Sequence, residues 1–318
     1  MIHGTFLGLL SLAPALSIAL PQTFKPAPGN FPAKGDGDYA GGIFSIPLSE
    51  LPKYAGAGGT GPEAPTGAGA KTSGSGPYPA VMTTDSTLPG HTIFAPKIPP
   101  SGNLSLPFIA WGNGACMLNA GEYERLLVEI ASYGYVIAAD GSPTGAGSTV
   151  QQSKVQDMRD SLDWAFAGKA KKYGNIDLAK VTTAGHSCGG LEAMSTAYHD
   201  ERVKRIIMFN IAIFQDDRRY LLQEIKVPVA YLIGGSKDMG YETSAKDYAL
   251  LNAGLPKLRA NLDTGHGGTF QATNGGKQGK AAVAYLEWQW RENATAKAYI
   301  LNGGLTKDNW IVEHANWF

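Results

Sequence analysis

The chain has 318 residues, of which 43% are apolar, so it can bury a sizeable core and wholesale disorder is excluded. The 27 Lys and Arg residues are balanced by 27 Asp and Glu residues, so the chain has no excess of positive charge for binding nucleic acid or an anionic membrane. Two cysteines exclude a disulfide-rich scaffold and a four-cysteine zinc site.

The N-terminus predicts a secretion signal. Residues 1–20 contain no Asp, Glu, Lys or Arg, and the stretch from Phe6 to Leu20 is mostly apolar. Small residues precede a cleavage site that we place near Ala19, so 1–19 is the expected signal peptide and the protein is expected to be extracellular. The alternative is a buried apolar helix. The run is short for a membrane span and Pro14 interrupts it, and no other segment is apolar enough to cross a bilayer.

Residues 20–76 are rich in Gly, Pro and Ala, and residues 77–318 carry the regular pattern of a folded domain. We expect the first stretch to be a mobile leader that adds little to the core, because such a composition offers little apolar surface to offset the entropy of ordering. Two sequons, at Asn103 and Asn293, fit glycosylation of an exported protein.

From residue 77 onward, short apolar strands alternate with helical periodicity. Strands are predicted at 78–83, 92–96, 106–111, 135–139, 181–184, 205–210, 227–233 and 258–262. Helices are predicted at 120–133, 150–172, 189–198, 242–252 and 279–290. This alternation predicts an α/β fold with a mostly parallel sheet of about eight strands and helices on both faces. Residues 292–318 still carry large apolar side chains and are expected to pack on the domain.

A candidate nucleophile lies between a predicted strand and a predicted helix. The segment Gly185-His186-Ser187-Cys188-Gly189 matches G-x-S-x-G, in which glycines permit a sharp turn and the close approach of the helix. The helix N-terminus also supplies N–H groups and a positive dipole end that stabilise an oxyanion. The alternative is a glycine-rich turn with a capping serine.

A serine nucleophile needs a histidine base. His266, in the glycine-rich loop after the last predicted strand, is the candidate, because that loop can carry the ring over the sheet edge. The other histidines are set aside by position: His3 in the signal, His91 before the catalytic strands, His186 pointing away beside the nucleophile, His199 at a helix end and His314 in the C-terminal stretch.

Asp238 is the candidate acid that orients the histidine. It follows the strand at 227–233, from which a carboxylate can reach a neighbouring loop. Asp263, three residues before His266, and Asp140, after the fourth strand, are the alternatives. The chain order Ser187, Asp238, His266 is the one expected for an α/β-hydrolase arrangement with no large lid.

An oxyanion hole needs two N–H donors. The Cys188 N–H is one candidate, and the N–H of Asn113 or Gly114, in the glycine turn after the third strand, is the other. Cys116 lies in that same turn, so the fold brings it towards Cys188. We expect either a disulfide between these cysteines, which would hold the two donors together, or two buried thiols.

Three segments carry a resemblance to known families: Trp111-Gly112-Asn113-Gly114, the stretch from Ile130 to Ala138, and the elbow with Gly190 after it. They resemble secreted α/β-hydrolases of the chlorophyllase, dienelactone hydrolase and cutinase-like polyester hydrolase families, over about residues 77–290. The resemblance implies a Ser-Asp-His esterase without metal or cofactor. Two departures concern the substrate, namely Trp111 where relatives have His or Pro and Cys188 where polyester hydrolases have Met.

We therefore expect a secreted serine esterase. The short connection between the strands at 205–210 and 227–233 favours an open site for bulky or polymeric esters. Trp111 and Phe214 are either substrate contacts or core residues. A lactone hydrolase, an acyltransferase or a non-catalytic binding protein on the same fold are the alternatives, and oligomeric state is undetermined.

Overall fold

The computed structural model describes residues 31–54, 68–102, 104–145 and 152–317. The predicted signal peptide and Asn103 lie outside these ranges. Nine strands form one sheet in these residues: β1 (Ala80–Thr84), β2 (His91–Pro96), β3 (Ser105–Gly112), β4 (Val136–Asp140), β5 (Asn175–His186), β6 (Arg205–Phe209), β7 (Val229–Ile233), β8 (Lys257–Asn261) and β9 (Ile311–Ala315).

The strand order is β1-β2-β4-β3-β5-β6-β7-β8-β9. The strands from β4 to β8 in this order run parallel, whereas β1 and β2 at one edge and β9 at the other pair antiparallel. The architecture is therefore α/β with a mostly parallel sheet, as the alternation predicted. Strand β9, which pairs with β8, was not predicted, because its sequence Ile-Val-Glu-His-Ala is neither a continuous apolar run nor an alternating one, and its residues are exposed or half-buried at the sheet edge.

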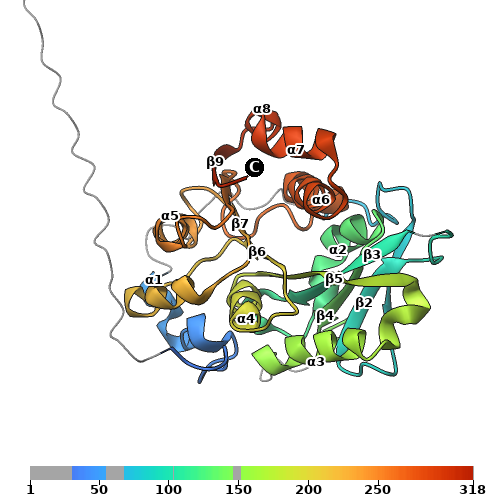
Figure 1. Ribbon diagram of the computed structural model, residues 1–318, viewed down its shortest axis with the longest axis horizontal. Helices are drawn as coiled ribbons and strands as arrows, with labels where there is room; N and C mark the ends of the chain where they lie inside the picture. The colour runs from blue at the N-terminus through green and yellow to red at the C-terminus, as the bar shows by residue number, and fades with distance from the viewer. Residues whose placement is uncertain (1–30, 55–67, 103, 146–151, 318) are drawn as a thin grey trace, which may run out of the picture.

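Helices cover both faces of the sheet (Figure 1). The α-helices are α1 (Leu51–Tyr54), α2 (Glu124–Ala131), α3 (Val155–Phe166), α4 (Cys188–Ala197), α5 (Tyr241–Leu250), α6 (Gly276–Arg291), α7 (Ala294–Leu301) and α8 (Gly304–Lys307). The 3-10 helices are η1 (Gly42–Phe44), η2 (Leu48–Glu50), η3 (Gly114–Cys116), η4 (Ala120–Tyr123), η5 (Lys169–Tyr173), η6 (Asp216–Glu224) and η7 (Thr273–Gly275). Of these α-helices, none is long and apolar enough to cross a bilayer.

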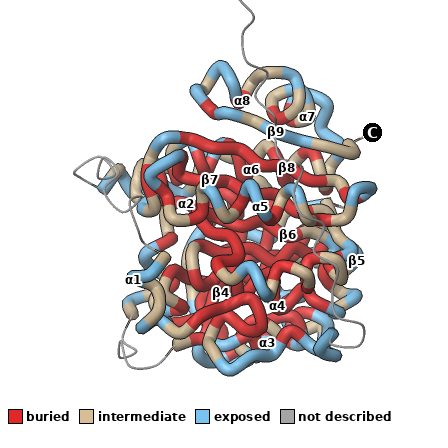
Figure 2. The backbone as a smooth tube through the Cα atoms, turned by 90° about the vertical axis from the view of Figure 1, so that its left-hand side faces the viewer, coloured by how far each residue is buried: buried red, intermediate tan, exposed pale blue. Residues whose placement is uncertain are grey.

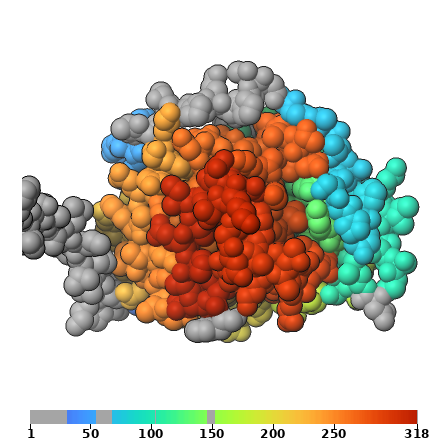
Figure 3. Space-filling view, turned by 90° about the horizontal axis from the view of Figure 1, so that it is seen from above, coloured from blue at the N-terminus to red at the C-terminus, as the bar shows by residue number. Residues whose placement is uncertain are grey.

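Two apolar layers follow from the alternation of side chains along the buried strands. In β3, Phe108 and Ala110 pack with α3 and α4, while Ile109 and Trp111 pack with α2 and α6. Figure 2 shows this buried interior between exposed outer surfaces. The C-terminal helices α7 and α8 add Ile300 and Leu305 to the second layer, and Figure 3 shows the C-terminal part of the chain spread over one face.

The described parts of the predicted leader are packed on the domain, so its interpretation as a mobile stretch is wrong for these residues. We call residues 31–54 the strap. Its apolar anchors Ile43, Phe44 and Ile46 are buried in the layer that contains α3 and α4. Glycine here serves close approach: a Cβ at Gly35 would lie 1.7 Å from the Ser195 carbonyl oxygen of α4.

Residues 68–76, the second described part of the leader, also pack on the domain. The Gly69 N–H donates to the Gln271 carbonyl (2.8 Å), and the Arg125 side chain donates to the Gly69 carbonyl (2.7 Å). The Ser75 N–H donates to a Glu129 carboxylate oxygen of α2 (2.7 Å). Side-chain and backbone hydrogen bonds thus order a segment that contributes few apolar groups of its own.

Candidate active site

Ser187 occupies a sharp turn between β5 and α4. Its backbone has φ 52° and ψ −125°, a conformation that residues other than glycine rarely adopt. The flanking glycines make this turn possible, because a Cβ at Gly189 would lie 2.0 Å from the Gly112 carbonyl carbon, and one at Gly185 would lie 2.2 Å from the Gly189 carbonyl oxygen. The G-x-S-x-G pattern therefore reflects contact between α4, β3 and β5.

Ser187, His266 and Asp238 are connected by hydrogen bonds. The Ser187 Oγ lies 3.0 Å from Nε2 of His266, and Nδ1 of His266 lies 2.8 Å from Oδ1 of Asp238. The Asp238 carboxylate is buried and accepts N–H bonds from Gly234 (2.8 Å) and Gly240 (3.2 Å). The His266 ring is 27% exposed, so it is open to solvent on one side.

The loops that carry the acid and the base are bonded to each other. The Gly234 carbonyl after β7 accepts the N–H groups of Thr264 (3.0 Å) and Gly265 (2.8 Å) after β8. These two strands are parallel neighbours, so their carboxyl ends meet at one edge of the sheet. The edge thereby sets the distance between Asp238 and His266.

The rival acids occupy other positions. Asp263 is exposed and has no hydrogen bond to His266 in the described residues. Asp140 is buried and pairs with His91, whose Nε2 lies 3.4 Å from its Oδ1. His199 pairs with Glu224, and His314 lies on β9.

His186 does not point away from the site, contrary to the expectation from sequence. Its ring lies 4.9 Å from the His266 ring, centroid to centroid, and its Nε2 lies 2.9 Å from the His266 carbonyl oxygen. Burial and the neighbouring His266 charge lower the pKa of His186 to about 3. The ring is therefore neutral and unsuited to act as a base at neutral pH.

The expected oxyanion donors lie on adjacent segments. The Asn113 carbonyl accepts the Gly189 N–H (3.0 Å), which joins the turn after β3 to the start of α4. Neither the Asn113 N–H nor the Cys188 N–H has a hydrogen-bond partner among the described residues. The Gly114 N–H donates to the Tyr123 hydroxyl (2.8 Å) and is thereby occupied. Of the two alternatives, Asn113 is the one left available.

Cys116 and Cys188 form a disulfide bond, with Cα atoms 5.2 Å apart. It joins the turn after β3 to the first residue of α4 and spans 72 positions of sequence. Both candidate donor segments are therefore tied by one covalent bond as well as by the Asn113–Gly189 hydrogen bond.

Trp111 and Phe214 are core residues in this structure. Trp111 is 1% exposed, and its Nε1 donates to the Asn113 side-chain oxygen (3.1 Å). Phe214 is buried, and its ring stacks on Tyr54 of the strap at 5.0 Å between centroids. Neither is a surface for substrate; Trp111 orients the Asn113 side chain instead.

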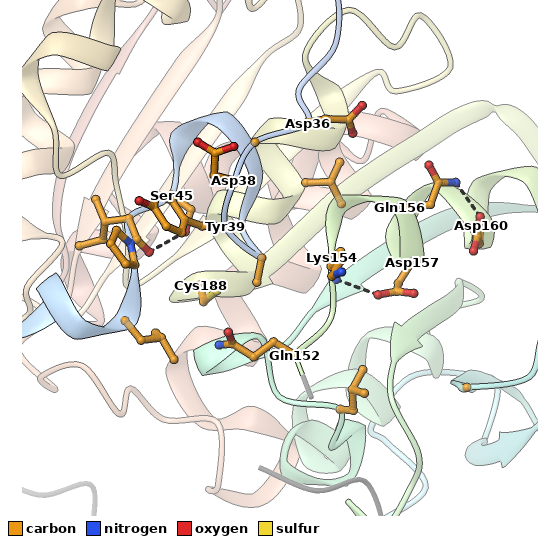
Figure 4. Close-up of a pocket in the computed structure, with 18 of the residues that line it drawn as sticks. Asp36, Asp38, Tyr39, Ser45, Gln152, Lys154, Gln156, Asp157, Asp160 and Cys188 are labelled. Carbon is orange, nitrogen blue, oxygen red and sulfur yellow. Dashed lines mark hydrogen bonds between the residues drawn. The ribbon is translucent and has the colours of Figure 1, made fainter. Parts of the chain in front are cut away.

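A cavity of about 940 Å³ reaches Cys188, the residue after Ser187, whereas Ser187, His266 and Asp238 are not among the residues that line it (Figure 4). The strap forms one wall with Asp38, Tyr39 and Ser45, and residues at and before the start of α3, such as Gln152, form another. The Gln152 amide donates to the Ala115 carbonyl (2.7 Å), so this wall is bonded to the turn after β3. Sequence analysis missed this role of the strap.

Asn210 and Gln278 are further site residues that sequence analysis missed. The Asn210 amide donates to the carbonyls of His266 (2.7 Å) and Gly265 (3.2 Å), and accepts from the Gln278 amide (2.7 Å). Both side chains are fully buried. A polar residue directly after buried strand β6 was the available signal for Asn210.

The described residues hold no group of three or more His, Cys, Asp or Glu side chains placed to bind a metal ion. Asn293 is exposed and caps α7 through its side-chain oxygen, which accepts the Ala296 N–H (3.0 Å).

No protein-family model matches the chain, and no curated protein is significantly similar to it.

Proposed function

We propose that the protein is a serine hydrolase of carboxylic esters with the α/β-hydrolase fold. The observation that carries this proposal is the hydrogen-bonded series from Ser187 through His266 to Asp238, with the serine on a strained strand-to-helix turn. The chain order of the three residues and their positions at the carboxyl ends of β5, β7 and β8 also support it.

The proposed reaction begins when Ser187 Oγ attacks the ester carbonyl carbon. His266 Nε2 accepts the hydroxyl proton and then gives it to the leaving alcohol as the ester bond breaks. Asp238 holds the Nδ1–H tautomer of His266 and stabilises the imidazolium. The N–H groups of Asn113 and Cys188 stabilise the oxyanion, and water then hydrolyses the acyl-enzyme by the same steps.

The short connection between β6 and β7 and the partly exposed His266 ring support an open site that takes an ester with a bulky group. A polymer end or a large acyl or alcohol group is therefore the proposed substrate class. Lactone hydrolysis and acyl transfer use the same three residues and are alternative reactions.

Export to the extracellular space is part of the proposal. The Cys116–Cys188 disulfide supports it, since such bonds persist in oxidising compartments. The apolar residues 1–19 and the exposed sequon at Asn293 also support it.

The proposed function is tested with a panel of p-nitrophenyl esters of increasing acyl length, a lactone and a polyester film. The wild-type protein should hydrolyse at least one ester class, and Ser187→Ala should not. The exposed-serine control Ser86→Ala should match the wild type. Equal rates for Ser187→Ala and the wild type would overturn the proposal.

A further inference from the structure

Three consecutive hydrogen bonds join the turn after β3 to the loop that carries His266. The Gly114 N–H donates to the Tyr123 hydroxyl (2.8 Å), and this hydroxyl lies 2.7 Å from Nδ1 of His186. Nε2 of His186 lies 2.9 Å from the main-chain carbonyl oxygen of His266. The series starts one residue after the candidate donor Asn113 and ends on the candidate base.

The direction of each hydrogen bond is fixed by the groups at its ends. The Gly114 amide can only donate and the His266 carbonyl can only accept. His186 therefore carries its proton on Nε2, which leaves Nδ1 as an acceptor for the Tyr123 hydroxyl proton. Every donor in the series has an acceptor only when His186 is neutral and protonated on Nε2. A second proton, on Nδ1, would leave the Tyr123 hydroxyl proton without its acceptor.

The surroundings keep His186 in that form. His186 and Tyr123 are buried, and the Phe270 ring lies 4.7 Å from the His186 ring and 5.7 Å from the Tyr123 ring, centroid to centroid. An apolar environment disfavours the imidazolium and strengthens hydrogen bonds between neutral groups.

The His266 carbonyl has a second donor, the Asn210 amide, at 2.7 Å. Asn210 is itself held by the Gln278 amide, and the Gln278 carbonyl oxygen accepts the Thr269 N–H (2.6 Å). The main chain of the His266 loop is thus held on one side by Asn210, which follows β6, and by Gln278 of α6, and on the other side by His186. Of these two sides, the one through His186 and Tyr123 leads to the turn after β3.

We propose that Tyr123 and His186 are positioning residues that set the oxyanion turn and the His266 loop relative to each other. This inference rests on the proposed function. By occupying the Gly114 N–H, Tyr123 selects Asn113 as the amide that faces the oxyanion. By donating to the His266 carbonyl, His186 holds the base at its distance from Ser187.

The first test compares Tyr123→Phe with Tyr285→Phe. Tyr285 is also buried in the layer with α2 and α6, but its hydroxyl has no partner among the described residues, so it is a matched control. For Tyr123→Phe we expect kcat on a p-nitrophenyl ester to fall by ~10- to 100-fold with KM within about twofold, since misplaced groups slow the chemical step. A kcat within twofold of the Tyr285→Phe value would overturn the inference.

The second test separates the hydrogen bonding of His186 from the packing of its ring. In His186→Gln the amide can still donate to the His266 carbonyl, whereas His186→Phe retains a packed ring without any donor. We expect kcat to decrease in the order wild type, His186→Gln, His186→Phe, with similar melting temperatures for the two variants. Equal kcat values for Gln and Phe would show that the ring acts by packing alone.

The third test does not depend on catalysis or on any variant. Nitrogen-15 NMR of histidine-labelled wild-type protein reads the tautomer of His186 between pH 5 and 8. The inference predicts a neutral, Nε2-protonated ring throughout, and a protonated or Nδ1-protonated ring would overturn it even in an active enzyme. A wild-type protein that has this tautomer but hydrolyses no ester would contradict the proposed function and leave the hydrogen-bonded series standing.

Discussion

The turn around Ser187 and the strap at residues 31–54 are both rich in glycine, yet only the first was interpreted correctly from sequence. At the turn, glycines lie at fixed positions between an apolar strand and a helix, so their role is local. In the strap, Gly35 and Gly42 approach α4, which lies more than 140 positions away in sequence. Glycine density alone does not distinguish a loose segment from one that packs closely on another element.

Substitutions at the turn should lower activity and leave stability unchanged, whereas substitutions in the strap should lower stability. The loss of ester turnover at the turn should be the largest effect. Ser187→Ala, His266→Ala and Asp238→Asn should each lower ester turnover by ~10³-fold or more, as for triad members generally. Each should retain the wild-type melting temperature within a few degrees. Steady-state kinetics measure the loss of turnover, and thermal denaturation measures the melting temperature. Near-normal turnover by His266→Ala would contradict the proposed mechanism.

The strap should show the opposite pattern. Phe44 is 1% exposed, and its ring packs on Tyr198, in the layer that contains α3 and α4, at 6.2 Å between centroids. Phe44→Ala should lower the free energy of unfolding by ~3–5 kcal/mol, the usual cost of emptying a buried aromatic site, with little change in kcat for the folded protein. Urea denaturation measures this cost.

Phe31, in the same strap, is 37% exposed and is the matched control. Phe31→Ala should cost less than ~1 kcal/mol. Equal and small costs for the two substitutions would show that the strap adds nothing to the core, as its composition first suggested.

Sequence pattern predicted most of the buried strands because strands with both faces covered read as continuous apolar runs. It missed β9, whose exposed and half-buried residues form neither an apolar run nor an alternation, and it missed the strap, whose three apolar anchors carry no periodicity. The hydrogen-bonded series of Ser187, His266 and Asp238 could be predicted because strand ends and turn glycines are local signals. Tyr123, Asn210 and Gln278 could not, since their roles depend on hydrogen bonds between elements far apart in sequence.

The disulfide should affect both the free energy of unfolding and kcat, because it joins the two segments with the proposed oxyanion donors and closes a long loop. Replacing Cys116 and Cys188 together with Ser should lower the free energy of unfolding by ~2–4 kcal/mol and reduce kcat more than it alters secondary structure. Circular dichroism, urea denaturation and kinetics measure these effects. The unfolded, non-reduced wild-type protein should show no free thiol among these two residues, and two titratable thiols would contradict the bond.

His91 lines the cavity beside the strap and gives a pH-dependent test of stability. Burial disfavours its charged form, but the hydrogen bond to Asp140 and the charge of that carboxylate outweigh burial and raise the pKa of His91 from 6.5 to about 9. Its stabilising contribution should be present near pH 6.5 and lost as the pH rises through about 9. Burial also raises the pKa of Asp140, so the contribution should fall again at acidic pH, when this carboxyl is protonated.

His91→Gln should therefore cost ~2–3 kcal/mol at pH 6 and progressively less towards pH 10. Urea denaturation of both proteins across this range measures the difference. A cost that does not change with pH would show that His91 contributes through packing and its main-chain contacts alone.

The most direct test of the central claim is labelling with a fluorophosphonate probe, followed by mass spectrometry of the labelled peptide. We predict a single covalent phosphonate on Ser187 in the wild-type protein, with labelling strongly slowed in His266→Ala and absent in Ser187→Ala. An unlabelled wild-type protein, or a label on another residue that persists in Ser187→Ala, would contradict the claim that Ser187, His266 and Asp238 form a working nucleophilic site.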